Sequence, residues 1–141
     1  MTARAHPPLL PARLVTLAFS AYVVAAIGLH WVAGADHVWE VAALMMVLMT
    51  VTYPTEAALA RQDRVLEFSI AGLLSALAIA GLFTSPLLII AAVLAHGVLD
   101  LVKARGLGVP FYALYFFGCA AFDFAYAACL FAYFIRFGGL G

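Results

Sequence analysis

Apolar residues follow one another in five long runs, which short polar or turn-forming segments separate. Each run approaches the roughly 20 residues that a helix needs to cross a bilayer. Charged residues at 61–64 and turn residues such as Gly34 and Pro86 mark the breaks. The pattern predicts a single all-α domain over residues 1–141, an integral membrane bundle of five transmembrane helices. The helices are expected at residues 14–33, 38–60, 65–83, 86–104 and 109–137.

The composition of the chain also indicates a membrane protein. The 141 residues are 67% hydrophobic and 10% charged, with a mean hydropathy of +1.12. Soluble domains are about 45–50% apolar and about 25% charged, so water could not cover this chain. The net charge is zero, which gives no basic footprint for nucleic acid. The first run could be a signal peptide, but its length and its end at Trp31 favour a retained helix.

Basic residues indicate the orientation of the five helices. With the N-terminus in the cytosol, six of the seven basic residues lie on the cytosolic side, and Arg136 lies outside. The six are Arg4, Arg13, Arg61, Arg64, Lys103 and Arg105. The alternative, a re-entrant pair formed by the third and fourth helices, leaves three full spans. We therefore expect a multi-pass protein, most simply of a bacterial inner membrane, with membrane lipids as its neighbours.

The last apolar run contains a single acid in aromatic surroundings. It holds 12 of the 17 Phe and Tyr residues, and Asp123 is its sole charge between Arg105 and Arg136. An ionisable group at this depth usually faces a partner or a cavity. Helical spacing puts Tyr112, Phe116 and Tyr126 on the side of Asp123. Carboxylate and rings together suit a cationic guest, while the alternative is that the rings face lipid and Asp123 pairs with a neighbouring helix.

Two other runs contribute ionisable side chains. His96, Asp100 and Lys103 share one face of the fourth helix, where Asp100 could orient the imidazole of His96 for proton transfer. A hydrogen-bonded core histidine is the alternative for His96, and Lys103 is expected to snorkel to headgroups. Glu56, with Tyr53 beside it, is expected in an interior pocket or at the interface. Pro54 should kink that helix, and Glu67 is interpreted as stabilising the start of the third helix.

A second polar group lies at the expected outer surface. It consists of His30, Asp36, His37 and Glu40, which are residue types that bind zinc. Helix capping and solvation explain Asp36 and Glu40 as well, so no metal is expected here. Haem is not expected either, because His96 has no second deep histidine at its level. The sequence thus predicts no cofactor.

Three short segments carry a resemblance to a known family. They are His96-x3-Asp100, Val109-Pro110-Phe111-Tyr112 and Cys119-x3-Asp123. Together they resemble a pattern in an uncharacterised family of small, multi-helix bacterial membrane proteins. The resemblance covers under a third of the chain, and that family has a histidine where this chain has Lys103. It implies that His96, Asp100 and Asp123 belong to one feature, and it implies no activity. In size alone the chain is also similar to the tryptophan-rich sensory protein and translocator protein family.

Three functions are compatible with these residues. The first is binding or acid–base processing, as by an isomerase or cyclase, of a small hydrophobic or lipid-like molecule. His96 and Asp100 would move a proton, and Asp123 with the rings of Tyr112, Phe116 and Tyr126 would stabilise positive charge. The second is proton-coupled transport by a homo-oligomer, with protons relayed along Glu56, Asp100, His96 and Asp123. The third is a structural or assembly subunit.

Overall fold

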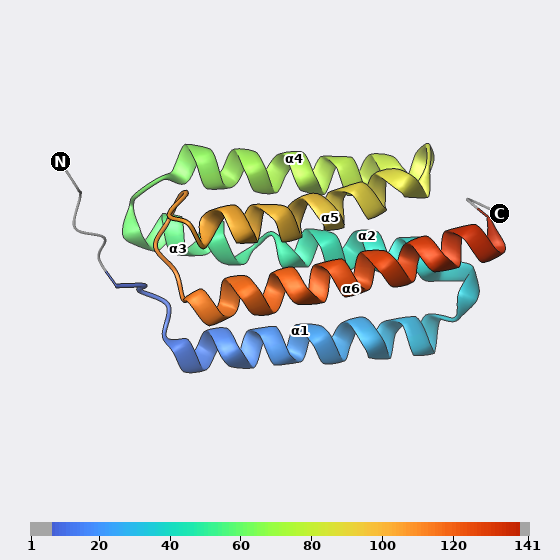
Figure 1. The fold of residues 1–141 in the computed structure, drawn as a ribbon, viewed down its shortest axis with the longest axis horizontal. Coiled ribbons are helices and arrows are strands. Elements are labelled where there is room, and N and C mark those ends of the chain that lie inside the picture. Colours follow the sequence, from blue (N-terminus) through green and yellow to red (C-terminus); the bar gives the residue numbers. More distant parts are fainter. Residues whose placement is uncertain (1–6, 139–141) are drawn as a thin grey trace.

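The computed structural model describes residues 7–138, and within them every regular element is a helix. Five helices are long and apolar enough to cross a membrane, as the sequence predicts. They run up and down in alternation, so that α1 begins and α6 ends at opposite ends of the bundle (Figure 1). The helices are α1 (Ala12–Ala33), α2 (Val38–Met49), α3 (Thr52–Ala60), α4 (Arg64–Phe83), α5 (Pro86–Lys103) and α6 (Ala113–Phe137), with a 3-10 turn, η1 (Ala35–His37), before α2.

The second span is broken, and Pro54 explains the break. A proline has no backbone N–H, so the carbonyl four residues earlier, at Thr50, loses its helical partner. α2 ends at Met49 and α3 begins at Thr52. Between them, the Val51 N–H donates to the carbonyl of Leu48, three residues earlier, at 3.3 Å. The expected kink is thereby confirmed. It turns the helix beside Tyr53, which belongs to the site described below.

The loop before α6 differs from the expectation. A helix was expected from Val109, but α6 begins at Ala113. A residue that precedes proline disfavours helical geometry, and Pro110 therefore holds this stretch extended. Gly108 adopts a φ of +74°, which favours glycine. The start of α5 agrees with the sequence, since Ser85 caps the helix and Pro86 follows at its first turn.

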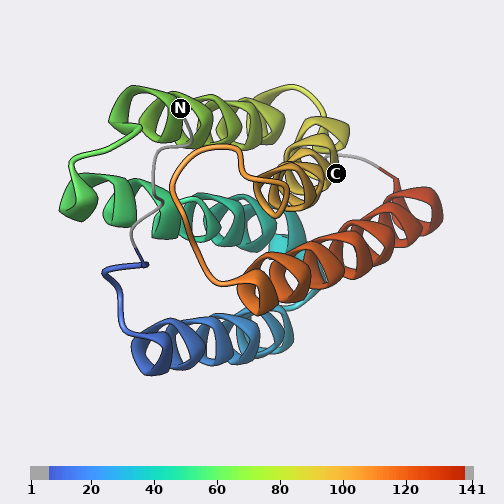
Figure 2. The same cartoon turned by 60° about the vertical axis from the view of Figure 1, so that its left-hand side comes forward.

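Helix α5 lies between α4 and α6, and α1 packs mainly against α2 (Figure 2). The buried face of α5 is apolar in its first half and ionisable in its second. Ile89 and Val93 are buried on the same face as His96, Asp100 and Lys103. The facing stripe of α6 includes Phe116, Cys119, Ala120, Asp123, Ala127 and Leu130, all buried. The two stripes meet along the bundle axis, which brings ionisable side chains of both helices together.

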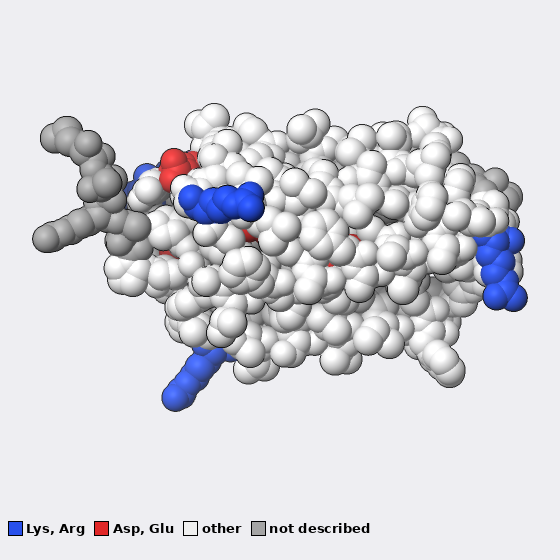
Figure 3. Space-filling view, in the orientation of Figure 1, with Lys and Arg blue, Asp and Glu red and all other residues white. Residues whose placement is uncertain are grey.

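The surface is apolar along its length and charged at its ends. In Figure 3, basic and acidic side chains gather at the end where α1 begins, basic side chains alone mark the other end, and the surface between them is uncharged apart from small acidic patches. Arg13, Arg61, Arg64 and Arg105 belong to segments at the end where α1 begins, and Arg136 lies at the other end. Arg4 lies outside the described residues. This distribution is what a membrane requires, because charged groups avoid the hydrocarbon core.

Candidate functional site

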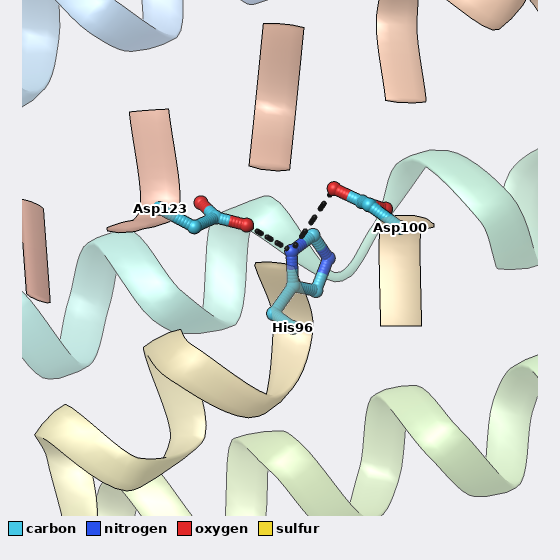
Figure 4. A group of neighbouring side chains, drawn as sticks. All are labelled: His96, Asp100 and Asp123. Carbon is cyan, nitrogen blue, oxygen red and sulfur yellow. Dashed lines mark hydrogen bonds and ion pairs between the residues drawn. The ribbon is translucent and has the colours of Figure 1, made fainter. Parts of the chain in front are cut away.

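His96, Asp100 and Asp123 meet in the middle of the bundle (Figure 4). A hydrogen bond of 2.8 Å joins His96 Nδ1 to Asp123 Oδ2, and Asp100 Oδ2 lies 3.6 Å from the same ring nitrogen. Gly97 permits this approach, because a Cβ atom there would lie 3.0 Å from Asp123 Cβ. The sequence prediction paired His96 chiefly with Asp100, whereas the closer partner is Asp123. We call these three residues the mid-bundle cluster.

Tyr53 connects α3 to the mid-bundle cluster. Its hydroxyl donates to Asp100 Oδ1 at 2.5 Å, and its ring lies nearly parallel to His96, with centroids 6.3 Å apart. The Phe116 ring also stacks on the Tyr53 ring, with centroids 5.7 Å apart. The break before α3 therefore presents a phenol to a carboxylate that is fully buried. Tyr53 and Phe116 were expected near this site, and they border the Asp100 side of it.

A second buried ion pair extends the polar interior. Lys103 Nζ donates to both carboxylate oxygens of Glu67, at 2.5 and 2.6 Å, and Val109 N–H donates to Oε1 at 3.1 Å. One expectation is therefore wrong. Lys103 does not snorkel to headgroups, because α4 offers it a carboxylate inside the bundle. Glu67 lies in the first turn of α4, as expected, and it is also buried beneath the α5–α6 loop, where it pairs with Lys103.

The ion pair and the mid-bundle cluster are adjacent. Lys103 Nζ lies 4.6 Å from the centroid of the Tyr53 ring, whose hydroxyl is bonded to Asp100. A cation over an aromatic face is attracted to it. The polar interior therefore runs continuously from Glu67 through Lys103, Tyr53 and Asp100 to His96. It ends at Asp123.

Glu56 and Tyr112 belong to a different place. Glu56 is fully buried, but its carboxylate accepts the backbone N–H groups of Leu9 and Leu10 at 2.6 and 2.9 Å. Tyr112 donates its hydroxyl to the Leu10 carbonyl at 2.9 Å. Both side chains therefore fasten the segment before α1 to the bundle. The expectation that Glu56 shares a pocket with His96 and that Tyr112 surrounds Asp123 is wrong, because neither the kink nor the extended loop could be oriented from spacing.

Tyr126 is also engaged elsewhere. Its hydroxyl lies 2.6 Å from His30 Nε2, towards the other end of α1. His37, the other histidine of the outer polar group, lies 3.7 Å from the exposed Glu40 instead. Among residues 7–138, the metal-type donors that converge are those of the mid-bundle cluster, with ligand atoms within 4.8 Å of one another. Those three side chains are therefore the ones that could hold an ion.

A cleft opens beside Asp123, between α1, the second span and α6. Its volume is about 420 Å³, and we call it the lateral cleft. Two of the aromatic side chains that line this cleft with Asp123 come from α1. Spacing along α6 alone could therefore not identify them. Phe19, Tyr22, Tyr115, Cys119 and Phe122 line the cleft together with Asp123. The missed signal was the aromatic pair Phe19 and Tyr22, three residues apart in the middle of the first helix.

Two further spaces adjoin this arrangement. An apolar cavity of about 530 Å³, the outer cavity, shares Phe122 with the lateral cleft and includes Trp31 and Leu130 in its walls. A small void of about 10 Å³ lies on the other side of the cluster, against His96 and Asp100. That is about the space of one water molecule. Residues of the mid-bundle cluster thus line both a large cleft and a small void.

Within the described part of the chain, four buried polar atoms have no hydrogen-bond partner. Three of them belong to the mid-bundle cluster and the fourth to the wall of the lateral cleft. Buried polar groups are nearly always paired, so a group of such atoms marks a place for water, a proton or a ligand. The atoms are His96 Nε2, Asp100 Oδ2, Asp123 Oδ1 and Tyr22 OH.

Comparisons with known proteins add no functional information. No family model, no curated protein and no solved structure matches this chain. The function must therefore be argued from the chemistry of the site.

Proposed function

We propose that this protein takes a small hydrophobic, lipid-like molecule from the bilayer into the lateral cleft and exchanges a proton with its polar end. One observation carries the proposal. Asp123 lines the cleft with Oδ1 unpartnered, while Oδ2 is bonded to His96 Nδ1 at 2.8 Å. A carboxyl group held by an imidazole in this way is the arrangement that general acid–base chemistry uses.

The cleft suits a guest from the membrane. Its volume lies within the range of known small-molecule sites. Its lining is mostly apolar with a few polar groups, as in such sites. The outer cavity lies on the same side of the bundle, between α1 and α6, and the Phe122 side chain lines both spaces. The exposed faces of both helices are apolar, which supports entry from lipid rather than from water.

His96 gives Asp123 a means of renewing its proton. The ring carries Nδ1 on the Asp123 side, and its other nitrogen, Nε2, has no protein partner. The small void beside the ring has about the volume of one water molecule. A proton lost by Asp123 to a ligand can be replaced through the ring, while Asp100 Oδ2 at 3.6 Å stabilises the positive imidazolium.

The test is native mass spectrometry of the protein released gently from its host membranes. We expect a defined hydrophobic adduct on the wild-type protein that is absent from Asp123→Asn and retained by Asp36→Asn. Asp36 is a suitable control because it is an exposed acid outside the bundle interior. Equal adduct on wild type and Asp123→Asn, or no adduct on a folded wild type, would refute the proposal.

Proton-coupled transport is the second candidate, because close polar contacts connect Tyr53, Asp100, His96 and Asp123 across the bundle interior. The route differs from the expected one, since Glu56 is occupied by the segment before α1. A homo-oligomer would supply the second half of a transport path. Proton flux in liposomes that depends on both His96 and Asp123 would favour this candidate, and flux indifferent to both would exclude it.

The assembly-subunit alternative is not proposed. It requires intramembrane polar side chains that are turned towards a partner helix. The acids Glu56, Glu67, Asp100 and Asp123 are instead at most 1% exposed within this chain. For orientation we propose a cytosolic N-terminus in a bacterial inner membrane, supported by the four arginines at the end where α1 begins.

A further inference from the structure

The charges of the polar interior do not balance. Glu67 is matched by Lys103 in a bidentate pair. Asp100 and Asp123 are left with one imidazole between them, so even a protonated His96 leaves one negative charge over. Among residues 7–138, no other basic side chain is buried. An uncompensated buried ion costs several kcal/mol, so an added proton or a cationic guest must neutralise the cluster.

The lateral cleft offers a place for such a cation. Asp123 is completely buried, lies in the lining of this cleft and has one carboxylate oxygen, Oδ1, without a hydrogen-bond partner, so a ligand reaches that oxygen when a neighbouring side chain of the lining moves aside. The unpartnered hydroxyl of Tyr22 lines the same space and can accept a second N–H. An ammonium group, which donates three hydrogen bonds, matches these two acceptors.

Aromatic rings complete the surroundings. Tyr22 and Phe122 meet edge to face at 5.5 Å between centroids, and Phe19 approaches Phe122 at 6.4 Å. Their ring faces and edges form a wall of the cleft that holds the acid. Rings within about 6 Å of a cation stabilise it, most strongly where water is excluded. A carboxylic acid or an alcohol gains nothing comparable from these groups.

The outer cavity defines the rest of the ligand. It shares the Phe122 side chain with the lateral cleft, so a rotation of this ring would join the two spaces, and its lining includes Ile27, Trp31 and Leu130. These walls are apolar and lie towards the far ends of α1 and the middle of α6. They suit an unbranched or lightly branched hydrocarbon chain. The guest that fits both spaces is a cationic head with an apolar tail.

We infer that the lateral cleft binds a lipophilic amine, with its ammonium group on Asp123 and its chain along the outer cavity, and that binding releases one proton. The inference rests on the proposed function and names its ligand class. The ammonium brings one positive charge into the cluster. The proton that neutralised the cluster leaves to water, so the net charge of the interior is unchanged.

The experiment compares dodecylamine with dodecanol and dodecanoate, which share the tail and differ in the head. Binding to the protein in lipid nanodiscs is measured by calorimetry in two buffers of different ionisation enthalpy, which counts the protons released. Empty nanodiscs correct for partitioning into lipid. We expect the amine to bind about tenfold more tightly than the alcohol, which corresponds to about 1.4 kcal/mol, with about one proton released.

Variants separate this inference from the proposed function. Asp123→Asn should lose the preference for the amine and the proton release, and Asp36→Asn should keep both. Phe122→Leu keeps the carboxylate, so it should weaken amine binding severalfold and leave proton release intact, even if Asp123→Asn does not fold. Equal affinity for amine and alcohol, or amine binding without proton release, overturns the inference and leaves lipid binding standing. No binding of any probe above empty nanodiscs overturns both.

Discussion

The buried pair of Lys103 and Glu67 allows a quantitative test of the interior. Both side chains are 1% exposed, and Lys103 Nζ reaches both oxygens of the carboxylate. Removing one partner of such a pair strands the other charge and costs about 3–5 kcal/mol. Lys103→Met should fall near the lower value, because Val109 N–H still donates to Glu67. Glu67→Gln should cost a similar amount, since Lys103 keeps only the Tyr53 ring and an amide oxygen.

The double variant Glu67→Gln/Lys103→Met allows the interaction energy between the two side chains to be measured. It carries no buried charge, and the glutamine oxygen can still accept from Val109 N–H. Replacing a buried ion pair by uncharged groups is often close to neutral, so we expect a loss of no more than about 1 kcal/mol. The two single losses of about 3 kcal/mol each then exceed the double loss by about 5 kcal/mol, so the coupling energy between the two positions should be about 5 kcal/mol, above the roughly 0.5–3 kcal/mol that is usual for residues in direct contact.

The assay is reversible unfolding in mixed micelles, followed by the fluorescence of Trp39, which is buried against Tyr133 and Phe134. Arg105→Met is the matched control, because Arg105 is exposed two residues beyond Lys103. It should change the free energy of unfolding by less than about 0.5 kcal/mol. A coupling energy within about 0.5 kcal/mol of zero would refute the reasoning, because it would mean that water or lipid headgroups compensate each charge separately.

Three other predictions use the same unfolding measurement or hydrogen exchange. Gly97→Ala should cost about 1–3 kcal/mol, because its Cβ would press on the facing helix, whereas Gly72→Ala, with nothing within 4 Å, should be neutral or stabilising. Tyr53→Phe should cost about 1–3 kcal/mol by removing a donor from a buried carboxylate, more than Tyr115→Phe, whose hydroxyl bonds a neutral threonine. Glu56→Gln should speed amide exchange in the segment before α1 about tenfold or more, and unchanged exchange would contradict the contacts seen.

The sequence was sufficient for the five spans and for the buried face of α5. Hydropathy located the five spans, Pro54 located the break, and spacing placed His96, Asp100 and Lys103 on one stripe of α5. Depth was also informative, because an acid such as Asp123 is costly in a membrane and turns inward. These are properties of single helices. They follow from rise, period and burial cost, and they need no knowledge of neighbours.

The relations between helices were beyond the sequence. The rotation of α4 decides whether Glu67 faces its own helix end or Lys103, and spacing within α4 does not contain that information. Phe19 and Tyr22 belong to the wall around Asp123 because α1 lies near α6, a contact between residues about one hundred positions apart. Helical spacing places Tyr126 on the same face of α6 as Asp123, yet its hydroxyl bonds His30 of α1.

The position of the break in the second span links the two halves of the polar interior. An unbroken helix would carry Tyr53 at a different rotation, and Asp100 would then lose its donor while Lys103 would lose its ring. Both contacts depend on one side chain, which lies one residue before Pro54. The Glu67–Lys103 pair and the mid-bundle cluster are therefore coupled through Tyr53. Because the polar interior from Glu67 to Asp123 holds three acids and two bases, a change of charge at Asp123 should alter the electrostatic environment of Lys103, which does not line the lateral cleft.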